Sequence, residues 1–288
     1  MNSERKYSMK NYRKLIALIL ALGMILFLAA CGGSGDKNSG NNELEKGTAQ
    51  SSADFFEWDG DYIYALTEKG AKQKSLVIPE TCSGFIGSVF ADVENNVEEV
   101  SFAGNRITSL DGVFTCAPTI KKVTLPEGLT AINAMDFWLC ASLETVVIPE
   151  TCTVIDDYAF QECPVLKTVS IQGEGLNRVG ERAFDMCGAL EEIVLPDSVT
   201  EIGEYAFNEC VALTEIALPK SLSAIGAGAF MNSGLLYVDV PAEMELASTD
   251  ATSFAQAHNS VIFRIVEGSW ADLHFEEAFG DIYEREYK

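Results

Sequence analysis

The chain has 288 residues, of which 43 are aspartate or glutamate and 20 are lysine or arginine, giving a net charge of −23. A surface this acidic repels the phosphates of nucleic acids and anionic lipid headgroups, so the composition argues against both as partners. The chain has two histidines and no P-loop, dinucleotide fingerprint or nucleophile-elbow motif. We therefore expect no catalytic site, no metal site and no cofactor.

The chain begins with a basic stretch, residues 5–14, followed by an apolar run that extends to Ala30. The run is too short for a comfortable membrane span and has the flanks of a secretory signal, so residues 1–30 are predicted as a signal peptide. It ends in LAAC, which closes on Cys31 and resembles the lipobox of bacterial lipoproteins. The resemblance implies diacylglycerol on the Cys31 sulfur, cleavage just before it, and a lipid-anchored, extracytoplasmic protein. The alternative is a retained membrane helix in which Cys31 has no role.

Residues 31–53 are rich in glycine, serine and asparagine and lack apolar periodicity, which predicts a flexible tether. An N-terminal cap is predicted over residues 54–75, because aromatic side chains alternate from Phe55 to Leu66 around an Asp-Gly pair. Such a pair between alternating apolar residues is typical of a β-hairpin. The hairpin is expected to cover the first turn of the fold that follows.

A repeat of 22–24 residues runs through residues 76–241. Two sets of positions recur with the same period, so one supersecondary unit is repeated and the chain is predicted to form a solenoid. Each unit holds a short alternating strand, and the spacing leaves no room for a long helix. The predicted fold is an α/β-type repeat solenoid, a rod of short parallel strands joined by compact coils or short helical turns. The recurring residues are Phe137, Phe160, Phe184, Phe207 and Phe230, and Pro126, Pro149, Gln172, Pro196, Pro219 and Pro241.

The unit reads IP-x-x-[VL]-T-x-I-G-x-x-AF-x-x-C-x-x-L-x-x-[VI]-x-[IL]-P, which resembles the BspA-like leucine-rich-repeat family, the fifth leucine-rich-repeat type. The resemblance covers about Leu76 to Val240. It implies a leucine-rich solenoid and, for many members, a bacterial surface protein that binds proteins of a host or a neighbouring cell, and it does not imply an enzyme. Two segments depart from the pattern: SVFADVENN lacks the AF and Cys positions, and SIQGEGLNRV has Gln172 for proline and one extra residue.

Seven further cysteines fall inside the repeats, and most are predicted to pack as buried thiols. Cys82 and Cys152 share a position that holds leucine or valine in other turns, and free cysteine behaves as a small hydrophobe. Disulfides between adjacent turns remain the alternative, since export favours oxidation. The other five cysteines recur at steps of 23 or 24 residues and are predicted to form one column: Cys116, Cys140, Cys163, Cys187 and Cys210.

A C-terminal cap is predicted over residues 242–288. It consists of a last strand, Val261 to Val266, followed by a helix whose N-cap is Ser269, with Asp272 three residues later. Three apolar residues are expected to close the core, and both histidines lie in this cap. The apolar residues are Trp270, Leu273 and Phe279, and the histidines are His258 and His274.

Two surfaces compete as the binding site. The outward side chains of the strands form a small, mixed face that includes Val147, Val194 and Tyr237. In the coil after Phe137, Trp138 and Leu139 stand where other turns carry mostly polar residues. One interpretation is an exposed apolar interaction patch. The alternative, which we prefer, is that Trp138 folds back to cover the neighbouring turn around Val113 and Phe114.

These observations together predict a lipid-anchored, extracytoplasmic protein that acts as a protein-binding module or adhesin at the bacterial cell surface. The expected partner is a protein or a cell-surface polymer, contact with the membrane is expected through the lipid on Cys31, and the chain is expected to be a monomer. The alternative function is a structural or accessory envelope lipoprotein without a dedicated ligand.

Overall fold

The computed structural model describes residues 53–288, apart from residues 251, 256, 258–260 and 281–282. The predicted signal peptide, Cys31 and nearly all of the predicted tether lie outside the described residues. A short 3-10 helix, η1 (Ala53–Phe55), precedes the predicted hairpin, in which β1 (Phe56–Asp59) pairs antiparallel with β2 (Tyr62–Leu66). Gly60 turns the hairpin with a φ of 61°, a left-handed angle that glycine adopts readily. β4 (Gly84–Phe85) and the helix α2 (Glu68–Ala71) complete this N-terminal cap.

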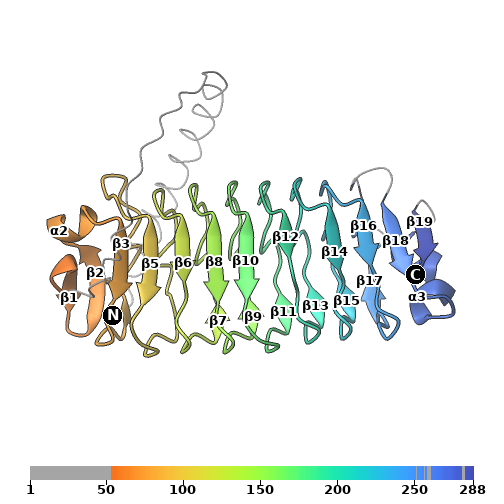
Figure 1. The fold of residues 1–288 in the computed structure, drawn as a ribbon, viewed down its shortest axis with the longest axis horizontal. Helices are drawn as coiled ribbons and strands as arrows, with labels where there is room; N and C mark the ends of the chain where they lie inside the picture. Colours follow the sequence, from red (N-terminus) through yellow and green to blue (C-terminus); the bar gives the residue numbers. More distant parts are fainter. Residues whose placement is uncertain (1–52, 251, 256, 258–260, 281–282) are drawn as a thin grey trace, which may run out of the picture. The chain divides into compact units, whose positions relative to one another are not determined.

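The predicted strands form one side of every repeat and pair in parallel with the strands of neighbouring turns (Figure 1). Inward side chains such as Val146 and Ile148 are fully buried, while the residues between them face outward. This side consists of two sheets that adjoin between β12 and β14. The first sheet holds β3 (Ser75–Ile78), β5 (Glu99–Phe102), β6 (Lys122–Thr124), β8 (Thr145–Ile148), β10 (Thr168–Ile171) and β12 (Glu192–Ile193), and the second holds β14 (Glu215–Ala217), β16 (Tyr237–Asp239), β18 (Ile262–Ile265) and β19 (Glu284–Tyr287).

A second set of parallel strands, each two residues long, forms another side of the repeats. The sequence predicted these segments only as part of a compact coil. The strands are β7 (Ala131–Ile132), β9 (Val154–Ile155), β11 (Arg178–Val179), β13 (Glu201–Ile202), β15 (Ala224–Ile225) and β17 (Ser248–Thr249). In the first five of them, β7 to β15, the second residue points inward, as Val179 and Ile202 do, and the first points outward.

A continuous stack of phenylalanine rings fills the core between these sides. Neighbouring rings lie 4.9–5.3 Å apart between centroids and are within 11° of parallel. The stack is longer than the sequence predicted, because Phe90, Phe114 and Phe254 also belong to it. SVFADVENN therefore does supply the phenylalanine of its turn. The stacked rings are Phe90, Phe114, Phe137, Phe160, Phe184, Phe207, Phe230 and Phe254.

The coil around each phenylalanine is bonded to the next turn although it is not a strand. From Phe114 to Phe230, the second residue after the phenylalanine adopts a left-handed backbone, with φ between 55° and 61°. In the first five of these turns, its N–H donates to a carbonyl of the next turn, as Glu162 N does to Asp185 O at 2.9 Å. Buried backbone groups need such partners, so these bonds offset the unfavourable angle. The left-handed residues are Cys116, Leu139, Glu162, Met186, Glu209 and Asn232.

The C-terminal cap contains the predicted strand and helix, with one misplaced side chain. Ser269 Oγ accepts a 3.3 Å hydrogen bond from Asp272 N and starts α3 (Trp270–Leu273), which is followed by α4 (Phe275–Phe279). Phe279 is buried as predicted, but the prediction that Leu273 closes the core is wrong, because its side chain is 73% exposed. It lies on the outer side of a single helical turn. β19 then returns alongside β18, in parallel, as a final strand that the sequence did not indicate.

Candidate functional site

The outward side of the two sheets that contain β8 and β14 is called the strand face, and three of the predicted binding residues lie on it. Val147 of β8 is half-buried between Thr124 and Ser170, its partners in the ladder. Val194, just past β12, is 70% exposed, and Tyr237 of β16 is 37% exposed. The three residues occupy separate turns, so no single apolar patch joins them.

The strand face is interrupted on both sides of β12. β10 pairs with β12 through only two positions, Thr168 with Glu192 and Val169 with Ile193, whereas β10 pairs with β8 through four. Among the described residues, no strand pairing links β12 to β14. The interruption lies beside the irregular turn, where Gln172 replaces the repeat proline and Gly173 adopts a φ of 77°. The ladder thus opens after Val169 and Ile193.

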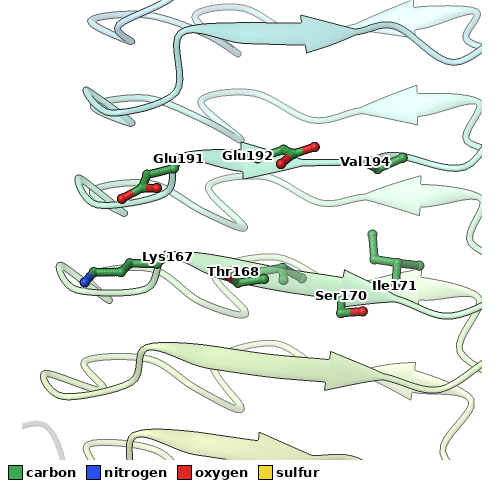
Figure 2. A pocket seen from close by; sticks show the side chains of 8 residues that line it. Lys167, Thr168, Ser170, Ile171, Glu191, Glu192 and Val194 are labelled. Carbon is green, nitrogen blue, oxygen red and sulfur yellow. The ribbon is translucent and has the colours of Figure 1, made fainter.

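A shallow groove of about 330 Å³ lies where the ladder opens, between β10 and β12 (Figure 2). Charged side chains line the end where the strands begin, and apolar ones line the end where they finish. The floor reaches the core: Val169 is 5% exposed and Ile171 half-buried, whereas their neighbours in β8 are fully buried. The lining residues are Lys167, Glu191 and Glu192 at the charged end, Thr168 and Ser170 between, and Val169, Ile171 and Val194.

Charged residues at the C-terminal end of the strand face are paired with one another. The Arg264 guanidinium donates to the carboxylates of Glu215 and Asp239 and lies over the Tyr237 ring, 4.9 Å from its centroid. Lys288 Nζ also contacts Asp239, at 2.8 Å. The hydrogen bond to Glu215 is the main cause that raises the pKa of Arg264 above its ordinary value. These contacts hold the Arg264 guanidinium over the Tyr237 ring.

Trp138 and Leu139 lie on the coil, away from the strand face. The prediction that they form an exposed apolar pair is wrong, because Trp138 is only 8% exposed and Leu139 is half-buried. The burial agrees with the alternative in which Trp138 folds against the protein. Its Nε1 has no hydrogen-bond partner among the described residues. A role for either residue in binding stays a prediction.

The thiols within residues 53–288 are free, but the column is not the one predicted. Cys140, Cys163, Cys187 and Cys210 follow a stacked phenylalanine by three residues and are fully buried. Cys116 is placed wrongly by its spacing: it follows Phe114 by two residues, has a φ of 58° and is half-buried. Ala117 takes the column position in that turn. Simple counting missed this because the turn is one residue out of phase.

The part of the chain that the structure describes lacks two other kinds of functional feature. In that part, no three histidine, cysteine, aspartate or glutamate side chains are arranged to hold a metal ion. None of its helices combines the length and apolar character needed to cross a membrane.

Solved bacterial structures resemble the chain to a limited degree. A leucine-rich repeat protein from Bacteroides ovatus is 20% identical, with 72% of this chain and 61% of that chain covered and a TM-score of 0.49. One from T. pallidum is 24% identical, with 66% and 84% covered and a TM-score of 0.46, and one from Eubacterium ventriosum is 23% identical, with 56% and 59% covered and a TM-score of 0.36. This chain thus spans less than two thirds of the Bacteroides ovatus protein.

Family membership rests on the repeat itself. No curated protein matches the sequence. The family described as BspA type Leucine rich repeat region matches residues 63–187 and 177–267 in six copies, which is well over half of the chain. These residues include the stacked phenylalanines and the strands on either side of the groove. The chain belongs to the BspA-type leucine-rich-repeat family.

Proposed function

We propose that the protein is a lipid-anchored, extracytoplasmic binding module or adhesin that holds a protein or a surface polymer against its strand face. The observation that carries this proposal is the groove on that face, where an exposed valine, Val194, stands beside free carboxylates. Repeat proteins use such extended surfaces to bind partners. The described residues offer no arrangement of side chains typical of catalysis, so we also propose that the protein is not an enzyme.

The proposed location depends on the N-terminal sequence. The LAAC segment ending at Cys31 supports a lipid on that sulfur, and the polar residues after it supply a spacer. A net charge of −23 repels anionic headgroups, so the lipid rather than the protein surface would hold the chain at the membrane. Cys31→Ser in the full chain should therefore release the protein from the detergent phase or leave an uncleaved precursor. A variant that is processed and still partitions like wild type would overturn the anchor.

Binding by the strand face can be tested with two exposed valines. Val194 lies on the strand face and Val211 on a loop of another side, and they are 70% and 61% exposed. A photo-crosslinking amino acid is introduced at each position of the full chain, and the cells are irradiated intact. We expect a discrete crosslinked product at position 194 and none at position 211. Equal products at both positions, or none at either, would favour the accessory envelope role instead.

A further inference from the structure

We propose that the groove between β10 and β12 binds an extended peptide segment of the partner, with a lysine or arginine two residues away from an aliphatic side chain. This inference rests on the proposed function, because it names the part of the partner that the strand face would hold. It depends on three features of the groove: an apolar floor, unpaired carboxylates and the spacing between them.

The apolar end of the groove combines an exposed valine with a partly uncovered isoleucine. Val194 is 70% exposed, and behind it Ile171 is half-buried where the matching residue of β8, Ile148, is fully buried. Figure 2 shows Val194 and Ile171 at the same end of the groove. An aliphatic side chain seated there would remove apolar surface from water, at about 25 cal/mol for each Å² covered.

The charged end is not neutralised by the protein. Glu191 and Glu192 are exposed, and neither forms an ion pair with a residue that the structure describes. Some other carboxylates of the strand face are paired, as Glu215 and Asp239 are with Arg264. A basic side chain of the partner would therefore meet free carboxylates here. Lys167, on the β10 wall, would repel that side chain and keep it on the β12 side.

The spacing selects an extended partner. Glu192 and Val194 are two residues apart along β12 and its continuation, so their side chains lie on one side of the strand, about 6.6 Å apart along its axis. An extended peptide repeats its side chains with the same spacing on one side. A basic residue and an aliphatic residue at positions i and i+2 would thus reach both ends of the groove together, whereas a helix would place those residues on different faces.

Two probe peptides and a matched control can test this assignment with the full-length chain. Both peptides are pentapeptides with serine at positions one, three and five and isoleucine at position four, and both are acetylated, amidated and fluorescently labelled. One carries lysine at position two and the other carries glutamate. We expect wild-type protein to bind the lysine peptide about fivefold more tightly, which is the upper range for one exposed ion pair. Glu192→Lys should reverse the preference. Glu99→Lys, the same charge change in the same strand position of β5, should leave it unchanged, and Val194→Ser should weaken both peptides.

The result separates this inference from the proposed function. Wild-type protein that binds neither peptide at about 1 mM, or both equally, overturns the peptide assignment. So does a preference that Glu99→Lys reverses and Glu192→Lys does not. If position 194 still crosslinks to a partner on cells under any of these outcomes, the strand face binds a partner, but the groove does not bind a basic segment of it. Unchanged thermal unfolding of the variants excludes misfolding as the cause.

Discussion

The thiol of Cys163 donates a hydrogen bond of 3.1 Å to the carbonyl oxygen of Phe137, which lies in the preceding turn. Three other column cysteines do the same at 3.0–3.2 Å. Burial raises the pKa of the Cys163 thiol well above its ordinary value, so the reactive thiolate is suppressed. The column cysteines therefore act as packing groups that also satisfy a buried carbonyl.

We predict that Cys116 reacts first with a thiol reagent, well before the buried cysteines. Cys116 is half-buried, although burial still raises its pKa to about 11. The other six cysteines in the described part are buried and should react only when the protein unfolds. Timed alkylation of native protein followed by peptide mass spectrometry measures the order. Early labelling of Cys163 or Cys187, or a disulfide found without reductant, would contradict the assignment.

Replacing a stacked ring should be costly. Phe160 is fully buried and stacks on Phe137 and Phe184, with centroids 4.9 and 5.1 Å away. Phe160→Ala should lower the free energy of unfolding by about 3–5 kcal/mol, because it removes buried apolar surface and leaves a cavity. Urea denaturation measures the change. Val165→Ala, at a residue that is 36% exposed in the same turn, is the control and should change stability by less than about 1 kcal/mol.

Asp136 should make stability depend on pH near 6. Burial is the main cause that raises the pKa of its carboxyl to about 6, although the N–H groups of Gly112 and Asn133 donate to it at 2.9 and 2.7 Å. Since the folded pKa exceeds the unfolded one, the contribution to stability is full below about pH 4 and is lost as the pH rises through 6. The loss corresponds to about 3 kcal/mol. The unfolding free energy of wild type minus that of Asp136→Asn should therefore fall by about 3 kcal/mol between pH 4 and 7.5. A difference that stays constant would refute the shift.

Trp138 should prove to be a core residue. Because its side chain is only 8% exposed, Trp138→Ala should lower the free energy of unfolding by about 3–5 kcal/mol. Leu139→Ser, at the half-buried neighbouring position, should cost much less. Thermal unfolding of the two variants measures both effects. A Trp138→Ala protein that keeps its melting temperature but loses a crosslinked partner would instead support the exposed interaction patch.

The sequence was sufficient for the parts of the fold that recur with a period. Val146 and Ile148 alternate in the way that only a half-buried strand requires, and each proline marked where such a strand ends. Ser269 and Asp272 similarly carried a local signal for the helix start. Each of these features is determined by neighbours in the chain, and they were therefore predictable.

Other features depend on how one turn meets the next. Cys116 lies one residue before the column position of its turn. The spacing between cysteines cannot reveal this shift, because the coil accommodates it without changing the length of the repeat by more than one residue. Trp138 looked exposed because its equivalents are polar, but the space beside it is set by the preceding turn. The groove at Val194 is also invisible to a single-turn analysis. It arises because β10 and β12 stop pairing after Val169 and Ile193. Strand pairing depends on the residues of two neighbouring turns, so the sequence of one turn cannot predict it.

The stacked phenylalanines have a consequence for how this chain can change its length. The described strands of every turn pair only with those of its two neighbours, and the junction between Phe184 and Phe207 resembles the one between Phe207 and Phe230. Duplicating or deleting the 23 residues from one ring to the next would rebuild an equivalent junction. Deleting one residue would instead shift every later side chain of that turn. Lineages can thus lengthen or shorten such a protein by whole turns while its two caps stay intact.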